Sequence, residues 1–206
     1  PYAGPEPRKD ADHRLENTYS KMVHPETDEG EDFLRQLTKE GKIPSKENFD
    51  AFLEKLHNSK HIPDAEDAEL VTRFEMQQFC PDILITNYSM LEYMLLRPRE
   101  KKIWDDTKRW LESDPKNKLL FVIDEAHMYR GSAGGEVSLL IRRLFHRLGI
   151  DRSRVQFILT TASMPNNDEE DRKEVRDFAN ALTASDDNHS FCYLTLSLIH
   201  ISEPTR

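Results

Sequence analysis

Two adjacent carboxylates, Asp124 and Glu125, directly follow an uninterrupted apolar run, Leu119–Ile123. Such a run is typical of a buried strand in a parallel sheet. Open α/β sheets bind their ligands at the carboxyl ends of their strands, so we expect this pair of acids to lie at a ligand-binding edge. The alternative is a solvated acidic turn after a core strand, which an isolated Asp-Glu pair would favour.

The four residues Asp124–His127 read Asp-Glu-Ala-His, which resembles the Walker B box of superfamily 2 helicases of the DEAD/DEAH type. The resemblance implies ATP hydrolysis with Mg²⁺ as the metal. Asp124 would hold the ion through water, because Mg²⁺ dehydrates reluctantly. Glu125 would polarise the attacking water, and His127 would couple the γ-phosphate to a second motor domain. We therefore expect these three residues to be catalytic.

A second segment, residues 81–91, resembles motif Ib of the same family, with a short strand that ends in Thr86 and Asn87 before a helix. The resemblance implies that these two residues bind nucleic-acid phosphates together with the helix N-terminus. Capping of the helix by Asn87 or Ser89 is an equally good explanation.

A third segment, residues 155–163, reads as a strand with a polar end, Thr161-Ala162-Ser163. It resembles motif III, usually Ser-Ala-Thr, with the two hydroxyl residues exchanged. The resemblance implies that Thr161, Ala162 and Ser163 link hydrolysis to strand separation. Strand ends rich in Thr and Ser are common, so this segment would be weak evidence for motif III without the Asp-Glu-Ala-His box before it.

Residues after the box resemble large bacterial DNA helicases of the repair and phage-defence kind, and they read Tyr129-Arg130-Gly131, Gly134-Gly135-Glu136-Val137 and Arg142-Arg143-Leu144. This resemblance favours DNA over RNA as the partner. It implies that Arg130 contacts nucleic acid or the partner motor domain. A salt bridge within the domain is the alternative for Arg130.

The apolar pattern supports an α/β fold without the resemblance. Strands expected near 83–85, 119–123 and 155–159 alternate with amphipathic helical stripes, which predicts a parallel sheet flanked by helices, of the RecA-like kind and incomplete. The stripes are Met90, Leu91, Met94 and Leu95; Val137, Leu140, Ile141, Leu144, Phe145 and Leu148, closed by Gly149; and Val175, Phe178, Ala179 and Leu182.

A phosphate-binding loop of the form Gly-x-x-x-x-Gly-Lys-Ser/Thr does not occur in this sequence. The one Gly-Lys pair is Gly41-Lys42, and Ile43 follows it. We therefore expect a fragment of the first motor domain of an ATP-dependent helicase or translocase, inactive alone and completed by a second RecA-like domain of the same chain. The alternatives are a motor subunit of a restriction or defence complex that translocates duplex DNA without unwinding it, and a non-catalytic scaffold, against which the intact Glu125 argues.

Three segments are expected. Residues 1–75 form an acidic, mostly helical insertion with a net charge of −7, with helices expected at Asp32–Gly41 and over the stripe Phe49, Phe52, Leu53 and Leu56. It either decorates the motor or serves partner binding or DNA gating. Residues 76–195 form the partial motor domain, and its stretch 76–184 carries no net charge. Residues 196–206 match the translation of a transposase sequencing adapter and are excluded from the fold.

The composition places few limits on function. The net charge of −9 neither supports nor refutes nucleic-acid binding, because the acidity lies largely outside the motor segment. No apolar run approaches the roughly 20 residues of a membrane span, so no membrane contact is expected. Two cysteines, Cys80 and Cys192, give no disulfide framework, which suits the cytoplasm. The eight histidines show no metal-ligand spacing.

Overall fold

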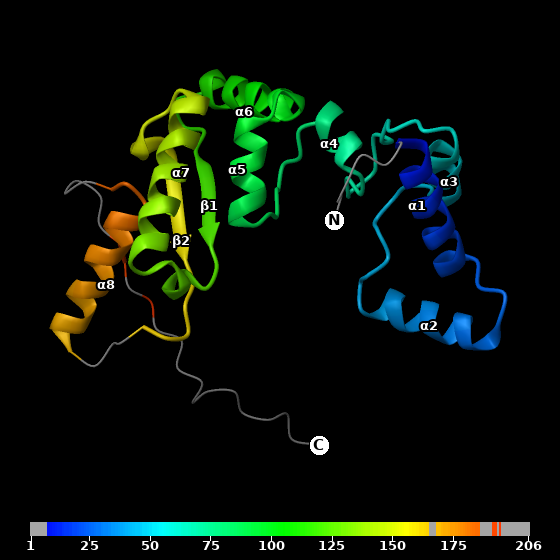
Figure 1. The fold of residues 1–206 in the computed structure, drawn as a ribbon, viewed down its shortest axis with the longest axis horizontal. Coiled ribbons are helices and arrows are strands. Elements are labelled where there is room, and N and C mark those ends of the chain that lie inside the picture. The colour runs from blue at the N-terminus through cyan, green and yellow to red at the C-terminus, as the bar shows by residue number, and fades with distance from the viewer. Residues whose placement is uncertain (1–7, 165–167, 186–190, 193, 195–206) are drawn as a thin grey trace, which may run out of the picture. The chain divides into compact units, whose positions relative to one another are not determined.

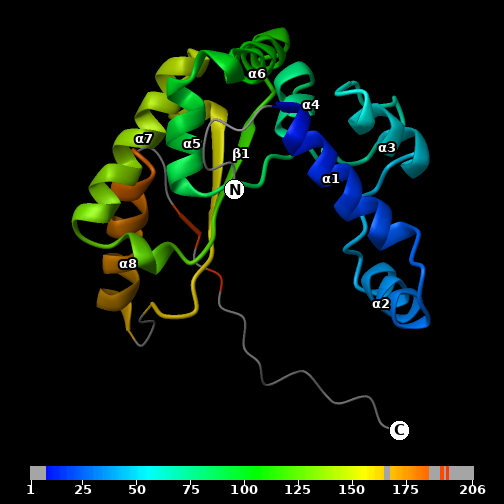
Figure 2. The same cartoon turned by 45° about the vertical axis from the view of Figure 1, so that its right-hand side comes forward.

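The computed structural model describes residues 8–164, 168–185, 191–192 and 194 (Figures 1 and 2). The predicted adapter segment, residues 196–206, lies outside them. The chain divides into an N-terminal unit, which extends to Ile85 and includes Pro98–Ile103, and a C-terminal unit, which comprises Thr86–Arg97 and the residues from Trp104 onward. Within the described residues, no helix is both long enough and apolar enough to cross a membrane.

The N-terminal unit is helical in its described part. Its elements are α1 (Arg8–Val23), α2 (Asp28–Lys39), α3 (Phe49–His57), α4 (Arg73–Gln78) and the short 3₁₀ helix η1 (Pro98–Glu100). The helix predicted at Asp32–Gly41 begins earlier, at Asp28, because the Thr27 hydroxyl accepts a hydrogen bond from the Gly30 N–H and three acidic residues occupy the first turn.

Helix α3 confirms the predicted amphipathic stripe. Phe52, Leu53 and Leu56 are buried, and the Asn48 side chain caps the helix by accepting from the Ala51 N–H. The unit also buries charge: the Lys46 ammonium lies 3.0 Å from an Asp67 oxygen and 2.8 Å from a Glu75 oxygen, with all three side chains almost fully enclosed. Buried charges of this kind need close partners, which these carboxylates supply.

The C-terminal unit contains the sheet. Its elements are α5 (Tyr88–Leu96), most of α6 (Lys101–Ser113), β1 (Leu119–Ile123), the 3₁₀ helix η2 (Ala126–Tyr129), α7 (Ser132–Leu148), the 3₁₀ helix η3 (Arg152–Arg154), β2 (Val155–Leu159) and α8 (Glu169–Leu182). Strands β1 and β2 are parallel and in the predicted positions, with Leu119 opposite Val155 and Ile123 opposite Leu159.

One face of this sheet carries the core of the unit. Ile123, Val155 and Phe157 pack there against buried residues of α7 and α8, and the Phe121 and Phe157 rings lie 5.4 Å apart. All six apolar residues of the predicted α7 stripe are buried, and Gly149 ends the helix at a φ of 69°. The amphipathic period therefore identified the face of α7 that holds the sheet in place.

The strand expected near 83–85 is not formed. Residues 83–85 are irregular, and Ile83 and Ile85 are 81% and 93% exposed. A strand needs a neighbour for its backbone N–H and C=O groups, and the sheet of the described residues pairs only β1 with β2. The apolar run at 83–85 indicated β-propensity, but the segment has no strand partner among the described residues.

Candidate functional site

The carboxyl ends of β1 and β2 place Asp124 beside Thr160. The register pairs Ile123 with Leu159, and the ladder continues through a bond from the Thr160 N–H to the Ile123 carbonyl at 3.0 Å. The Thr160 hydroxyl donates to Oδ1 of Asp124. Sequence reasoning did not single out Thr160, although extending the parallel register by one residue from the two strand ends identifies it.

Glu125 stands in a conformation that few residues adopt. Its φ and ψ are 49° and 46°, in the left-handed region. A residue with a side chain pays roughly 1–2 kcal/mol there relative to the right-handed region. This conformation turns the backbone sharply away from the direction of β1. The Glu125 side chain, next to Asp124, is 57% exposed. Strain of this kind tends to be retained at functional sites.

His127, in η2, connects the acids to the end of β2. Its Nδ1 lies 3.2 Å from Oε2 of Glu125 and 3.1 Å from Oγ1 of Thr161. Nδ1 and the Thr161 hydroxyl are within hydrogen-bond distance, and which of them donates depends on the ring tautomer, whereas Glu125 faces the same nitrogen as the partner in an ion pair. The Thr161 hydroxyl also accepts from the Ser163 N–H at 3.3 Å, whereas Ala162 and Ser163 offer exposed positions on this turn.

Two glycines allow the chain to turn from η2 into α7. Gly131 has a φ of 68°, which favours glycine. A Cβ added to Gly134 would lie 2.3 Å from the Tyr129 carbonyl oxygen, so the first turn of α7 packs directly on the backbone of η2. This close approach fixes the position of His127 relative to the long helix that covers the sheet.

The structure brings Asp124, Glu125, His127 and Thr161 together, whereas the hydrogen bonds of Thr86 and Asn87 are local to the start of α5. The Asn87 side chain caps α5 by accepting from the Met90 N–H at 2.8 Å, as the capping interpretation expects. The Thr86 hydroxyl is exposed and contacts only the Asn87 carbonyl, at 3.5 Å, among the described residues.

Arg130 lies five residues beyond Glu125 and is exposed. The salt bridge considered as its alternative role is not formed with any residue that the structure describes. The guanidinium therefore remains available on the surface that follows the Asp-Glu-Ala-His turn.

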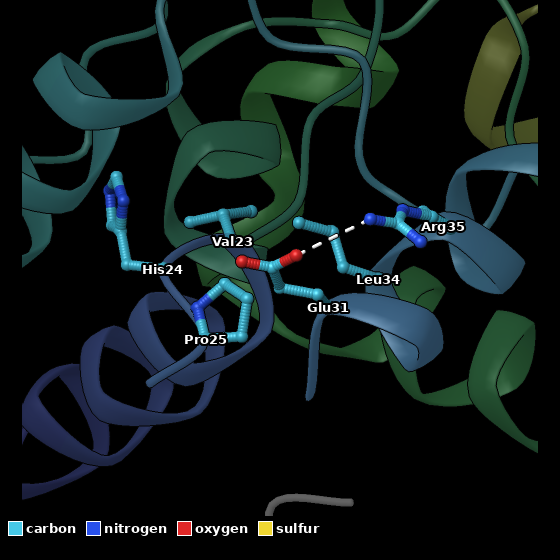
Figure 3. A pocket seen from close by; sticks show the side chains of 6 residues that line it. All are labelled: Val23, His24, Pro25, Glu31, Leu34 and Arg35. Atoms are coloured by element: carbon cyan, nitrogen blue, oxygen red, sulfur yellow. Dashed lines mark hydrogen bonds and ion pairs between the residues drawn. The ribbon is translucent and has the colours of Figure 1, made fainter. Parts of the chain in front are cut away.

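Two hollows lie elsewhere, one of them lined by Tyr88, Glu92, Glu136, Leu139, Leu140 and Arg143. The other, of about 440 Å³ in the N-terminal unit, is lined by Val23, His24, Pro25, Glu31, Leu34 and Arg35 (Figure 3). Its Glu31–Arg35 ion pair, at 3.3 Å, joins two largely exposed side chains one helical turn apart. Pairs of this type contribute little free energy and do not mark a reaction site.

Comparisons with known proteins agree with this geometry. The profile of the family described as "DEAD/DEAH box helicase" matches residues 35–171. The chain is 58% identical over 111 residues to "Druantia protein DruE" of Escherichia coli (strain UMEA 4076-1), across 54% of this chain and 6% of that protein. It is 29% identical over 100 residues to "Uncharacterized ATP-dependent helicase MJ1574" of Methanocaldococcus jannaschii, across 48% of this chain and 13% of that protein.

The chain thus spans only a small part of the length of both relatives. No solved structure matches it. The family profile covers well over half of the chain, and it includes both strands, the Asp-Glu-Ala-His turn and the residues after β2. The parallel sheet flanked by helices is the α/β, RecA-like arrangement expected from the sequence. The chain belongs to the DEAD/DEAH box helicase family.

Proposed function

We propose that this chain supplies the hydrolytic edge of an ATP-driven helicase or translocase that acts on nucleic acid, DNA in preference to RNA. The observation that supports this most directly is the connected polar cluster at the ends of β1 and β2, which contains Asp124, Glu125, His127, Thr160 and Thr161. Family membership supports the use of ATP. The cluster indicates which side chains would take part in ATP hydrolysis.

Asp124 fits the role of a magnesium ligand. Thr160 binds Oδ1, and Oδ2 has no hydrogen-bond partner among the residues that the structure describes. A carboxylate with one oxygen held by a hydroxyl donor presents the other oxygen in a set direction. Mg²⁺ keeps several of its waters and is held by one or two carboxylates together with phosphate oxygens, so Asp124 would bind it through water. The ion would neutralise phosphate charge during transfer.

Glu125 fits the role of the group that orients the attacking water. Its carboxylate is exposed beyond the strand end, one residue after the proposed metal ligand, and its Oε2 lies 3.2 Å from Nδ1 of His127. Movement of Glu125 toward a water would leave His127 with Thr161 alone. The proximity of one ring nitrogen to both Glu125 and Thr161 supports our proposal that Thr161, Ala162 and Ser163 link hydrolysis to movement.

Nucleic-acid contacts would come from outside this cluster. Arg130 is exposed without a partner among the described residues, and it follows the catalytic turn directly. Thr86 and the N-terminus of α5 offer a hydroxyl and backbone N–H groups to phosphates, although the Asn87 carboxamide oxygen is already used as a cap. The partner motor domain would close the site from the other side.

The test is a protein in which this segment is joined to a phosphate-binding loop and a second motor domain. We expect magnesium-dependent ATPase that DNA stimulates more than RNA does. Arg130→Ala should reduce this stimulation and its salt dependence without lowering ATPase in the absence of nucleic acid, whereas Lys173→Ala, on an exposed part of α8, should not.

Two assays on the joined protein distinguish unwinding of DNA from translocation along duplex DNA. Displacement of a DNA strand shows unwinding, and displacement of a third strand from a triplex without unwinding shows duplex translocation. The isolated 206-residue chain should show no ATPase, because its sequence lacks the phosphate-binding loop. Absence of nucleotide hydrolysis from the joined protein, with ATP binding intact, would favour a scaffold and overturn the proposal.

A further inference from the structure

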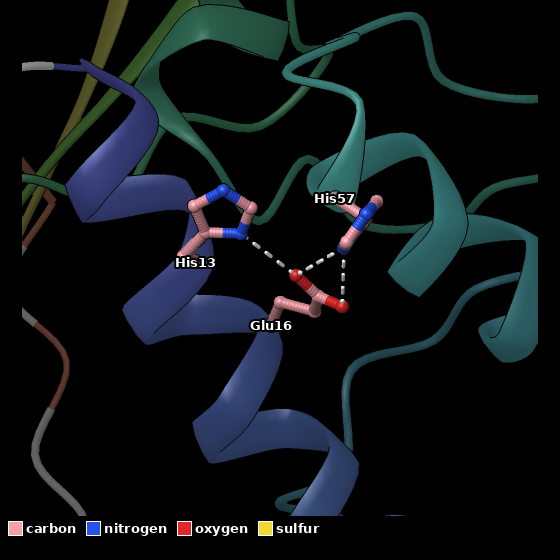
Figure 4. Close-up of side chains that lie close together, drawn as sticks. All are labelled: His13, Glu16 and His57. Atoms are coloured by element: carbon pink, nitrogen blue, oxygen red, sulfur yellow. Dashed lines mark hydrogen bonds and ion pairs between the residues drawn. The ribbon is translucent and has the colours of Figure 1, made fainter.

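The N-terminal unit brings two histidines and a glutamate together on the facing surfaces of α1 and α3 (Figure 4). His13 and Glu16 lie on one side of α1, and His57 stands in the last turn of α3. Nδ1 of His13 lies 3.2 Å from Oε2 of Glu16, and Nδ1 of His57 lies 3.1 Å from Oε1 of Glu16. All of these donor atoms lie within 4.8 Å of one another.

We propose that His13, Glu16 and His57 form a binding site for a divalent transition-metal ion, best suited to Zn²⁺. Two imidazoles and one carboxylate are a common three-ligand set for zinc with one position left open. Zn–N and Zn–O bonds of about 2.0–2.2 Å arranged tetrahedrally place neighbouring ligand atoms roughly 3.3–3.5 Å apart. The distances from Nδ1 of His13 and Nδ1 of His57 to the Glu16 oxygens, 3.2 Å and 3.1 Å, are already close to this ligand–ligand spacing.

Hydrogen bonding gives the same cluster a second explanation. Glu16 can accept N–H hydrogens from both rings at the observed distances. Metal binding requires the lone pair of each Nδ1 to point at the ion, so both rings would carry their hydrogen on Nε2 instead. The carboxylate is the same in both cases, and the side chains are partly exposed, which leaves room for a water as fourth ligand.

Neighbouring buried residues hold the ligands in place before any ion binds. Asp12, next to His13, is almost fully buried and lies 3.1 Å from Nε2 of His61. Leu56, next to His57, is 1% exposed. Edge-to-face packing of Tyr19 on α1 against Phe49 and Phe52 on α3 fixes the two helices further. A site on two anchored helices loses little ordering entropy on binding.

Sequence spacing did not reveal this group. His13 and Glu16 are three residues apart, which alone is common on helices, and His57 follows Glu16 by 41 residues. The two helices had to pack before the third ligand could be seen. An ion here would join α1 to α3 and stabilise the N-terminal unit, because a ligand that binds only the folded state adds to its stability.

The test is titration of the full 206-residue chain with Zn²⁺ by isothermal calorimetry. We expect one ion per chain at this site, together with a rise in thermal midpoint. His13→Ala and His57→Ala should each weaken binding by roughly 100-fold or more, beyond the 10–100-fold effect of losing a group that only supports a ligand. The matched control is His24→Ala, since His24 also pairs with a carboxylate, Asp50, but belongs to no group of three possible ligands among the described residues.

Substitution of Co²⁺ for Zn²⁺ gives an independent readout. The wild-type chain should show the visible absorption of a tetrahedral Co²⁺ site, and His57→Ala should lose it while keeping the circular dichroism of the folded chain. Glu16→Gln should weaken binding of both ions. The absence of saturable Zn²⁺ binding, or equal binding by wild type, His13→Ala and His57→Ala, would overturn the proposal. The three side chains would then serve only as a hydrogen-bonded contact between α1 and α3.

Discussion

Nδ1 of His127 lies 3.1 Å from Oγ1 of Thr161, a contact between two segments that are 34 residues apart in the chain. The parallel register of β1 and β2 makes this contact possible, because both residues follow strand ends at the same edge of the sheet. The same nitrogen faces Glu125 at 3.2 Å. One ring nitrogen therefore lies within 3.2 Å of both the Glu125 carboxylate and the hydroxyl that follows β2.

Removal of the Thr161 hydroxyl should uncouple hydrolysis from movement. In the joined motor protein, Thr161→Val keeps the side-chain shape but breaks the contact to His127 and the bond from the Ser163 N–H. ATPase should stay within a few-fold of wild type, while DNA movement per ATP falls by roughly 5–150-fold, the range of common coupling energies. Thr161→Ser, which keeps the hydroxyl, is the control and should behave like wild type.

Glu125→Gln should retain ATP binding and abolish turnover, since the amide cannot accept a proton from the attacking water. The expected loss in steady-state ATPase of the joined protein is about 10²–10⁴-fold. Glu170→Gln, at an exposed position of α8, serves as the control for loss of one negative charge. An ATPase rate for Glu125→Gln within a few-fold of wild type would show that another group orients the water.

Much of the motor unit could be predicted from local pattern. The apolar stripe of α7 predicted both the helix and its buried face correctly, because six apolar residues at helical spacing form a single face that can pack on the sheet. The run Leu119–Ile123 and the segment 155–159 gave the right strands, and the Asp-Glu-Ala-His letters gave the cluster at their ends. Periodicity and motif spacing are local properties, so the sequence carries them directly.

The remaining features depend on contacts that no local pattern encodes. Residues 83–85 have strand propensity but no partner, so propensity failed there. The uninterrupted apolar run of β1 predicted cover on both faces, yet Leu120 and Val122 are 56% and 54% exposed within the described structure. The burial of Lys46 and the facing of His13 with His57 both result from long-range packing, whereas Thr160 follows from the register of the two strands.

The glycine pair at the start of α7 should give opposite effects on stability. Gly134→Ala would drive a Cβ to 2.3 Å from the Tyr129 carbonyl, and the shift needed should cost about 1–3 kcal/mol. Gly135→Ala meets nothing within 4 Å and should stabilise the helix by roughly 0.5–1 kcal/mol. Urea unfolding of both variants measures the difference, and equal signs would contradict the close approach.

Lys46 should be a critical residue of the N-terminal unit. Its ammonium is fully enclosed between Asp67 and Glu75, and Lys46→Met would leave two carboxylates buried without a counter-charge. Breaking such a buried group costs about 3–5 kcal/mol. Arg35→Ala removes an ion pair whose side chains are 72% and 58% exposed, and should cost under about 1 kcal/mol. Chemical denaturation that shows similar losses for both would contradict the burial of Lys46.

Asp67 should make the stability of this unit depend on acid pH. Burial raises the pKa of its carboxyl, but the Glu47 N–H at 2.9 Å and the Lys46 ammonium outweigh burial and hold the pKa below its ordinary value of 3.8. A lowered folded-state pKa contributes stability that is fully present above the unfolded pKa and is lost as the pH falls through the folded pKa. The loss in unfolding free energy caused by Asp67→Asn should therefore be greatest above pH 3.8 and shrink as the pH falls below it. Asp82→Asn, at an exposed position without a described partner, should show no such trend, and a difference for Asp67→Asn that grows toward acid pH would contradict the sign of the shift.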